Sequence, residues 1–176
     1  MESRGAKILL RAMSDLTDFE RVASSLDPAM MIVTAVAGER RGGCLVGFHT
    51  QVSIDPPLML VCISQRNHTH EVAEEASVLA VHVVAEERRE IAELFGGETA
   101  DEVNKFERCG WTEGPQGVPL LDDCPVRFAG RILQMASFGD HTGFLLAPVR
   151  GGDARGGEQA PLRLDEVEEI DPGHEA

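Results

Sequence analysis

The stretch that decides the fold runs from Gly43 to Ser64 and reads GCLVGFHTQVSIDPPLMLVCIS. Two apolar runs enclose a polar cluster and the bend sequence Asp55-Pro56-Pro57, in which proline presets the backbone. The second run, residues 57–64, is apolar at nearly every position, which predicts a strand covered on both faces. The polar cluster around Thr50 therefore lies between two strand-like runs, and its position there requires an explanation.

The segments on either side of this stretch predict more strands than helices. Runs rich in Val, Ile and Thr are typical of strands, and they cover residues 29–38, 57–64, 78–84, 126–138 and 141–149. Helical spacing and capping residues predict helices after Thr17 and from Asn67, a helix with Glu86 and Glu87 in its first turn and Gly96 as its stop, and a short one after Thr99. ERRGG (39–43) predicts a turn. Few strands are separated in the βαβ manner, so we expect a largely antiparallel barrel, closed because closure removes exposed edges.

Composition and charge describe a globular protein. Hydrophobic residues make up 43% and charged residues 26% of the 176 residues, the ordinary balance of such a protein. The net charge of −14 argues against nucleic acid or an anionic membrane as partner, because phosphate binding requires clustered Lys and Arg. No apolar run approaches the roughly 20 residues of a membrane span, and the first residues lack the apolar centre of a secretory signal. The four cysteines have no CxxC spacing, so reduced thiols and a cytoplasmic location are expected.

The chain changes character near residue 150. The run RGGDARGG is rich in glycine, and the final residues DEVEEIDPGHEA are strongly acidic. We therefore expect one domain over residues 1–150 and a flexible acidic tail over residues 151–176.

Familiar catalytic signatures are absent. The sequence has no GxGxxG, GxxxxGK[ST], GxSxG or HExxH motif. His68 and His70 form an HxH pair, but no Cys or carboxylate joins them at metal-binding spacing. A solvated helix start explains the two imidazoles, and no metal is expected. A Ser-His-Asp triad would require a geometry that sequence alone does not reveal.

One helix start has the features of an anion site. A predicted strand ends at Ser64, and Gln65-Arg66 leads into a helix that begins between Asn67 and Thr69. The free N–H groups and the dipole of a helix N-terminus attract anions, and Arg66 adds a positive charge. Helix capping alone also explains Asn67 and Thr69. An anion site and a plain cap therefore both remain open.

Four motifs together resemble one known family. In order they are GCLVGFHTQVSIDPPL (43–58), NHTH (67–70), LAVHVV (79–84) and GDHTGFL (139–145). They resemble the flavin reductase family, whose members have the FMN-binding split-barrel fold and typically carry Ser-x-Asp-Pro-Pro-Leu in the first block and Gly-Asp-His near the end. The resemblance covers about residues 19–149. The Asp-Pro-Pro-Leu block is specific, whereas Gly-Asp-His alone is a weak signal.

The resemblance implies a mainly β protein: a split, Greek-key barrel with a few peripheral helices that forms a homodimer. It also implies FMN, or FAD, bound near the subunit interface and reduced by hydride from NADH or NADPH. By this resemblance, the flavin contacts are Leu45, Val46, Gly47 and Phe48 beside the ring, Thr50, Gln51 and Ser53 along the ribityl chain and phosphate, and Arg66, Asn67 and Thr69 at the phosphate.

The same resemblance implies roles for two histidines, His141 and His82. His141, in the Gly-Asp-His turn, resembles the family histidine that lies close to the flavin and the nicotinamide. Hydride transfer needs alignment and exclusion of water more than acid–base help, so we expect His141 to position the reactants; an imidazole there is also able to donate a proton. Its alternative role is to close the turn. His82 stands where relatives often carry Asn; it is expected to be a core residue, with a cofactor contact as the alternative. Leu45, Gly47 and Phe48 stand where relatives often carry Thr or Ser, so backbone contacts should carry more of the flavin binding.

The expected function is an NAD(P)H:flavin oxidoreductase that supplies reduced flavin to a separate monooxygenase. A non-catalytic flavin or cofactor binder on the same fold is an alternative from a different class, because binding and turnover are separable on one scaffold. A deazaflavin- or haem-linked enzyme of the wider split-barrel group is a third.

Overall fold

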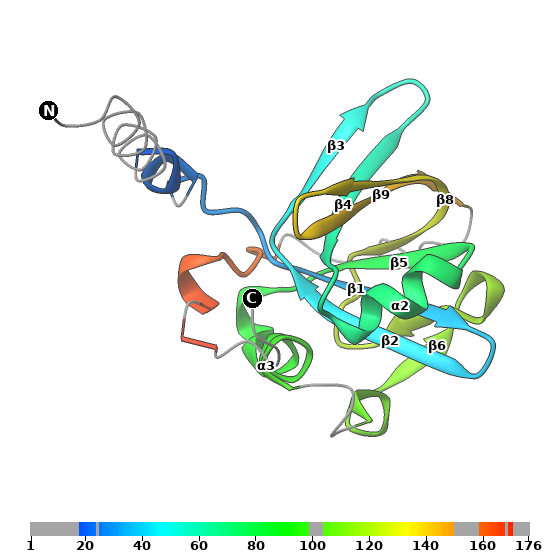
Figure 1. Cartoon of the computed structure of the whole chain (residues 1–176). Helices are drawn as coiled ribbons and strands as arrows, with labels where there is room; N and C mark the ends of the chain where they lie inside the picture. The colour runs from blue at the N-terminus through cyan, green and yellow to red at the C-terminus, as the bar shows by residue number, and fades with distance from the viewer. Residues whose placement is uncertain (1–17, 24, 99–103, 150–158, 168, 171–176) are drawn as a thin grey trace, which may run out of the picture.

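The structure, a computed structural model, describes residues 18–23, 25–98, 104–149, 159–167 and 169–170. Its centre is a seven-stranded antiparallel sheet of order β2-β1-β5-β8-β9-β4-β3, accompanied by a two-stranded sheet of β6 and β7 (Figure 1). The strands are β1 (Met31–Ala37), β2 (Arg40–Val46), β3 (His49–Ser53), β4 (Leu58–Ser64), β5 (Val78–Val83), β6 (Trp111–Glu113), β7 (Pro119–Leu121), β8 (Arg127–Phe138) and β9 (His141–Pro148). The α-helices are α2 (His68–Glu75) and α3 (Arg89–Gly97), and the 3-10 helices are η1 (Glu86–Arg88), η2 (Lys105–Glu107), η3 (Pro115–Gly117) and η4 (Asp165–Val167).

The predicted strands are confirmed within one or two residues, but the turn predicted at residues 39–43 is wrong. The turn is Gly38-Glu39, and Ala37 pairs directly with Arg40 across a two-residue hairpin. Gly38 has a φ of 60°, which suits glycine and fits a tight hairpin. Strand β2 lies at one end of the sheet, where the side chains of Arg40 and Arg41 remain exposed, so their charge does not interrupt the strand.

The sheet curls into a split barrel. Its two end strands, β2 and β3, are consecutive in the chain and are joined by Gly47-Phe48, but they do not pair with each other. The closed barrel expected from the residues alone is therefore replaced by the split barrel that the resemblance implied. Figure 1 shows β3 and β4 as a hairpin that rises away from β1 and β2.

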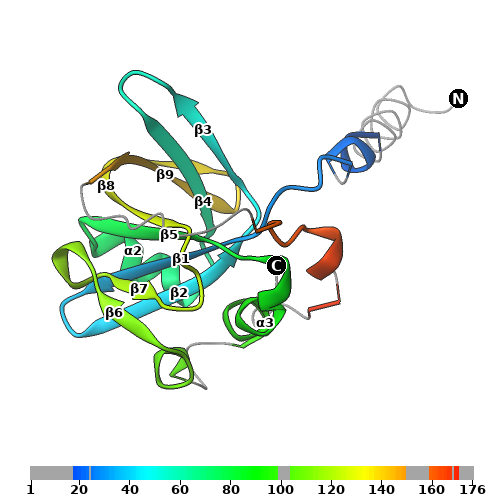
Figure 2. The same ribbon diagram turned by 180° about the vertical axis from the view of Figure 1, so that it is seen from behind.

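Two apolar clusters form most of the core. One lies between the curled sheet and α2, and includes Val33, Val61 and Phe144. The other surrounds Phe95 of α3 and includes Ile32 and Leu121 (Figure 2 shows α3 and β7 from behind). Burial of such side chains supplies most of the free energy that stabilises the fold.

Strand β4 differs from the prediction of a strand covered on both faces. Val61 and Ile63 are buried, whereas Leu60 and Cys62, which face the other side, are only partly buried. One face of β4 therefore belongs to the core, and the other is left half-covered in a single chain.

The described part of the segment predicted as a flexible tail is packed against the body. Leu162 is 2% exposed, its carbonyl accepts a hydrogen bond from Met30 N at 2.7 Å, and its N–H donates to Val84 O at 2.9 Å. Single bridges also join Ala29 to Arg163 and Ala85 to Pro161. These residues are therefore packed rather than free, while the domain boundary near residue 150 stays a prediction.

The helix predictions are confirmed in part. Residues 18–23 are helical, α2 begins directly after Asn67, and α3 continues to Gly97, one residue beyond the predicted stop at Gly96. The capping residues Thr17 and Thr99 lie outside the described residues. No helix in the described ranges is both long and apolar enough to cross a membrane.

Candidate functional site

A cavity of about 220 Å³ opens where β2 ends and the chain bends toward β3. Small-molecule sites usually measure about 300 to 1,000 Å³, so one chain encloses only part of a typical ligand. The lining residues come from β2, the bend, β4, the start of α2, β9 and the segment after residue 158, and they are Cys44, Leu45, Val46, Gly47, Phe48, Cys62, Ile63, Ser64, Asn67, His141 and Leu164.

The open edge of β2 supplies backbone groups to this region. Strand β2 pairs with β1 on one side only, and the carbonyl of Gly43 accepts a hydrogen bond from Lys105 Nζ at 3.3 Å, so it faces away from β1. Alternate residues of a strand direct their N–H and C=O groups to the same edge, so those of Leu45 also face away from β1. The carbonyl of Phe48 is already used, because it accepts from Cys62 N at 2.8 Å.

His141 lies at the edge of the cavity, at the first position of β9. It follows the tight turn at Gly139, whose φ is 68°, and pairs with Ser64 of β4. Its ring centroid is 5.1 Å from that of Phe48, with the two ring planes tilted by 57°. The imidazole donates from Nδ1 to Asp140 Oδ1 at 2.8 Å, which leaves Nε2 for a ligand.

This imidazole also affects its neighbour. The hydrogen bond from His141, followed by the charge of its ring, lowers the pKa of the Asp140 carboxyl, and Arg66 acts in the same direction. Because the Asp140 side chain is 77% exposed, the pair orients the imidazole more than it stabilises the fold.

The start of α2 is capped by Asn67. Its Oδ1 accepts a hydrogen bond from Thr69 N at 2.9 Å, so the plain cap considered from the sequence is present. Asn67 also lines the cavity. Arg66 is exposed beside it, and Gln65 N donates to the carbonyl of Asp140 at 2.9 Å, which ties the helix start to the His141 turn.

The structure separates Thr69 from the cavity. Its side chain is 1% exposed and packs against β2, where a Cβ added at Gly42 would come within 2.9 Å of Thr69 Cα. The close contact between helix and strand explains why Gly42 carries no side chain. The side chain of Thr69 therefore does not line this cavity, and its role toward a flavin stays a prediction.

The predicted contacts on β3 also lie outside the cavity. Thr50 Oγ1 donates to Gln51 O at 3.2 Å, and Gln51 Nε2 donates to Ser53 O at 3.0 Å. These side chains sit on an end strand of the sheet, where a second molecule could reach them. Their role toward a flavin stays a prediction.

The sequence interpretation missed several lining residues. Cys62 and Ser64 follow from the alternation of side chains along β4, whereas Leu164 had no signal because its segment reads as a polar tail. Cys44 is fully buried, and desolvation raises the pKa of its thiol to about 11, although Thr69 and Lys105 act in the opposite direction. The Cys44 thiol therefore stays protonated at neutral pH and is not a nucleophile.

His82 is a core residue, as predicted. It is 0% exposed, its Nε2 accepts from Leu121 N at 3.1 Å, and Nδ1 then donates to Ile32 O at 3.0 Å. Burial lowers the pKa of its imidazole to about 4. Both ring nitrogens are used in the core, so His82 has no function toward a cofactor.

The surroundings of His68 and His70 do not support a metal site in the part of the chain that the structure describes. Across the described ranges, no three His, Cys, Asp or Glu residues are grouped in a way that could hold a metal ion. His70 is 7% exposed and its Nε2 lies 2.8 Å from Thr142 Oγ1. The prediction of two solvated imidazoles is therefore wrong for His70, which faces the sheet.

The lining fits a flat ring with a polar rim. Apolar and sulfur-containing side chains form the walls, the edge of β2 offers backbone donors and acceptors, and His141 adds an imidazole nitrogen. An isoalloxazine ring has this combination of an apolar face and hydrogen-bonding edges, and flavin sites are built from such groups.

Comparisons with known proteins agree with this fit. The family model described as flavin reductase like domain matches residues 24–166. The protein named FMN reductase (NADH) RutF from Stutzerimonas stutzeri (strain A1501) is 32% identical over 124 residues, which make up 70% of this chain and 71% of that protein.

Solved structures of an NADH:FAD oxidoreductase and of a flavin reductase component share this fold. The Streptomyces globisporus C-1027 NADH:FAD oxidoreductase SgcE6 is 26% identical with a TM-score of 0.69, over 77% of this chain and 81% of that one. BorF, the flavin reductase component of a bacterial two-component tryptophan halogenase, is 27% identical with a TM-score of 0.66, over 76% of this chain and 84% of that one. The family model covers well over half of this chain, so the chain belongs to the flavin reductase-like domain family.

Proposed function

We propose that this chain is an NADH- or NADPH-dependent flavin oxidoreductase that binds FMN, or FAD, in the cavity at the bend between β2 and β3. The observation that carries the proposal is the meeting of Leu45 to Phe48, Asn67 and His141 around one cavity, although they are far apart in the sequence. Relatives at 32% and 26% identity are named FMN reductase (NADH) and NADH:FAD oxidoreductase.

The bound flavin supplies the chemistry of accepting and passing on a hydride. The chain's own residues hold and orient it: the open edge of β2 near Leu45 offers backbone hydrogen bonds, and Phe48 and His141 place two rings at the cavity edge. Asp140 holds the imidazole by accepting a hydrogen bond from Nδ1, so Nε2 of the neutral ring can accept from a reactant, and Nε2 of the protonated ring can donate to one. The apolar walls exclude water, which favours transfer between aligned rings.

A separate oxygenase is the proposed consumer of the reduced flavin. BorF, with the same fold, is named as the flavin reductase component of a two-component tryptophan halogenase. We propose that this chain likewise serves a separate monooxygenase.

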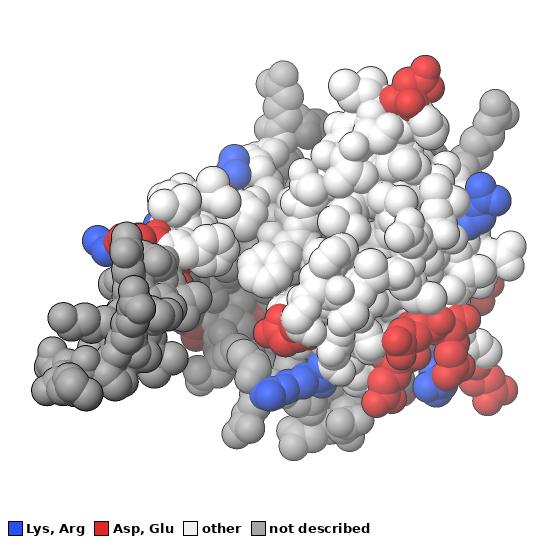
Figure 3. Space-filling model, turned by 45° about the horizontal axis from the view of Figure 1, so that its top comes forward, with Lys and Arg blue, Asp and Glu red and all other residues white. Residues whose placement is uncertain are grey.

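A second copy of this chain is the proposed partner at the site. Large apolar side chains are exposed in the bend before β3, along the β3–β4 hairpin and on β8, and they are Phe48, Val52, Ile54, Leu133, Met135 and Phe138. Figure 3, which brings the top of Figure 1 forward, shows a broad surface there without Lys, Arg, Asp or Glu. Exposed apolar surfaces of this kind mark protein interfaces, and a second copy would also enlarge a cavity that one chain only partly encloses.

The cytoplasm is the proposed location. Cys44, Cys62, Cys109 and Cys124 are all free thiols. Thiols persist in a reducing compartment, where they form disulfides only rarely.

Oxidation of NADH and NADPH in the presence of FMN, FAD or riboflavin tests the proposal. We expect nucleotide oxidation that depends on added or bound flavin. If FMN binds but oxidation of both nucleotides stays at background, the reductase is ruled out and a non-catalytic flavin binder remains. If no flavin binds, a deazaflavin and haem are the next ligands to titrate.

A further inference from the structure

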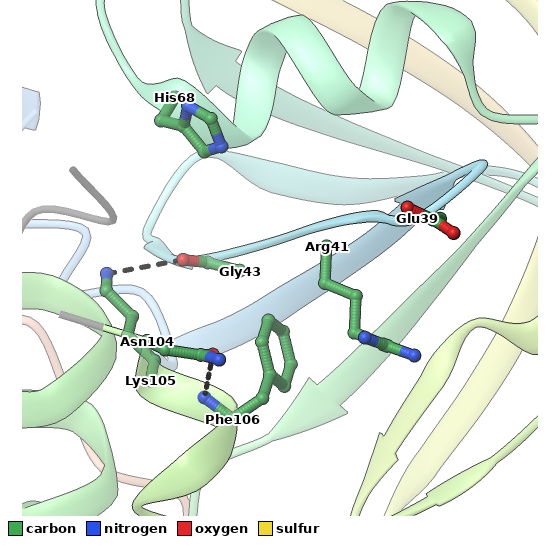
Figure 4. Close-up of a pocket in the computed structure, with 7 residues that line it drawn as sticks. All are labelled: Glu39, Arg41, Gly43, His68, Asn104, Lys105 and Phe106. Carbon is green, nitrogen blue, oxygen red and sulfur yellow. Dashed lines mark hydrogen bonds between the residues drawn. The ribbon is translucent and has the colours of Figure 1, made fainter.

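A second cavity, of about 190 Å³, is lined by parts of β2 and of the start of α2. These two elements also line the cavity at the bend between β2 and β3, where we propose that the flavin binds. The second cavity is lined by Glu39, Arg41, Gly43, His68, Asn104, Lys105 and Phe106 (Figure 4). The two cavities meet at neighbouring residues: Gly43 and His68 line this one, whereas Cys44 and Asn67 line the other. The two cavities are therefore adjacent along β2 and at the start of α2.

Positive groups dominate this second cavity. Arg41 and Lys105 carry charge, His68 adds an imidazole, and Glu39 supplies the one carboxylate of the lining. Figure 4 shows Lys105 and Arg41 on opposite sides of Phe106, with Glu39 beyond Arg41. In a chain of net charge −14, this local excess of positive charge favours an anionic ligand.

Lys105 is a buried cation among the residues that line this cavity. Its side chain is 5% exposed, and Nζ donates to Phe95 O at 3.1 Å and Gly43 O at 3.3 Å. An ammonium group has three N–H donors, so one donor remains beyond these two carbonyls. Among the residues that the structure describes, no carboxylate lies within ion-pair distance of Lys105. Burial lowers the pKa of the Lys105 ammonium, although the charges of Cys44 and Glu98 act in the opposite direction. An anion in the cavity would stabilise the charged form.

Arg41 lines the second cavity and offers a flat cationic surface there. Its guanidinium lies 4.9 Å from the ring centroid of Trp111, which holds it by a cation–π contact. Within the described ranges no carboxylate pairs with Arg41, whereas the preceding Arg40 pairs with Glu75. A guanidinium plane can stack on a nucleobase and also bind phosphate.

We propose that this cavity binds the adenosine phosphate part of a dinucleotide, with phosphate beside Lys105 and His68 and the adenine over Arg41. The volume suits a phosphate group rather than a whole nucleotide, so the base lies at the mouth. This inference rests on the proposed flavin reductase function, because the dinucleotide is either FAD, whose flavin occupies the neighbouring cavity, or the NADH that reduces it. The shared chemistry is an adenosine phosphate, and the experiment separates the two sources.

The test compares Arg41→Gln with the matched control Arg40→Gln, the next residue along β2. Dissociation constants for FMN, FAD and ADP are measured by titration calorimetry, and KM for NADH is measured with FMN present. We expect Arg41→Gln to weaken FAD or to raise KM for NADH about tenfold, the usual effect of losing a cationic side chain stacked on a base. FMN binding should stay within about twofold, and Arg40→Gln should leave every value near that of the natural chain.

Each possible result either supports or overturns the inference. Weaker FAD binding assigns the cavity to the flavin dinucleotide, and a higher KM for NADH assigns it to the nicotinamide dinucleotide. Values that all stay within about twofold, an equal loss of FMN and FAD, or the same effect in Arg40→Gln would overturn the inference. If the natural chain binds no flavin, the proposed function fails separately. ADP binding then decides the cavity: its loss in Arg41→Gln supports the inference, and no ADP binding to the natural chain overturns it.

Discussion

His141 is the residue that we propose lies beside the reacting rings. Because Asp140 holds Nδ1 and Phe48 lies beside the ring, the imidazole has a defined orientation at the cavity edge. Replacing His141 with Ala should lower turnover about tenfold or more through lost alignment. The dissociation constant of FMN should change by less than about threefold, since backbone groups hold the ring.

A second variant distinguishes the effect of the orientation of the imidazole on turnover from the effect of removing the imidazole. Asp140→Asn keeps His141 but removes the charge that holds Nδ1, so turnover should fall by less than in His141→Ala. Steady-state kinetics and FMN titration measure both variants. Unchanged turnover in His141→Ala would leave His141 as a residue that only closes the turn.

Arg66 is the positive charge beside the start of α2. The amide of Thr69 is already bonded to the Asn67 side chain, so the side chain of Arg66 has more to contribute to a phosphate than that amide. Arg66→Ala should weaken FMN about twofold to fivefold, the range of an exposed ion pair. Riboflavin lacks the phosphate and should bind with unchanged affinity. Fluorescence titrations with both flavins provide the measurement, and an equal loss for both would contradict a phosphate contact.

His82 predicts a pH dependence of stability. Burial lowers the pKa of its imidazole to about 4, whereas histidine in an unfolded chain titrates near about 6.5. Between these values the unfolded chain binds a proton that the folded chain does not. The free energy of unfolding should therefore fall as the pH falls through this window, by about 2 kcal/mol between about pH 7 and pH 5 from this residue.

Nitrogen-15 NMR of the imidazole rings isolates this effect from the other histidines. His82 should stay neutral, with the proton on Nδ1, down to about pH 4. Urea unfolding at both pH values gives the free energy. Protonation of His82 in the folded chain at the ordinary histidine value would contradict the prediction.

At the level of strands and helices, the sequence predicted what depends on local pattern. The β-branched runs predict β1, β5 and β9 because such side chains fit a pleated surface, and Asn67 predicts the start of α2 because its side chain can accept an amide hydrogen. The turn at Gly38-Glu39 was missed because two arginines can remain exposed on an end strand. Local pattern therefore predicts elements better than it predicts their ends.

The candidate site was predictable only where the motifs themselves line it. Gly47, Phe48 and His141 were expected together, and they meet. Thr69 was expected beside them, but the packing of α2 on Gly42 turns it into the core. Lys105 had no signal in the sequence, because its burial depends on tertiary contacts with Phe95 and Gly43, which lie 10 and 62 residues away in the chain.

Close packing between α3 and β2 gives a prediction at the same scale. A Cβ at Gly43 would come within 2.4 Å of Phe95 Cε1, a ring held in the core. Gly43→Ala should therefore destabilise the fold by about 1 to 3 kcal/mol, as overpacking does.

Gly47→Ala is the matched control for this substitution. There the nearest atoms to an added Cβ belong to Met30 at 3.7 Å, an ordinary contact distance. Denaturant unfolding measures both variants, and Gly47→Ala should stay within about 0.5 kcal/mol of the natural chain. Equal stability of the two variants would contradict the close contact between Gly43 and Phe95.

At the scale of the whole molecule, the exposed apolar surface predicts a dimer. Ile54 is 85% exposed at the tip of the β3–β4 hairpin, where water contact is unfavourable for so large an apolar side chain. We expect the protein to sediment as a dimer and Ile54→Asp to sediment as a monomer with weaker FMN binding. Thr112→Asp adds the same charge at an exposed position of β6 and should remain dimeric. A natural chain that is monomeric at micromolar concentration would contradict this prediction.

The most direct test of flavin reduction is the visible spectrum of the protein, titrated with FMN without oxygen and then with NADH or NADPH. Binding in the cavity at the bend should perturb the flavin bands at one equivalent per chain, and addition of at least one of the two nucleotides should then bleach them. A spectrum of FMN that the protein leaves unchanged, or a bound flavin that stays oxidised with both nucleotides, would contradict the proposed function.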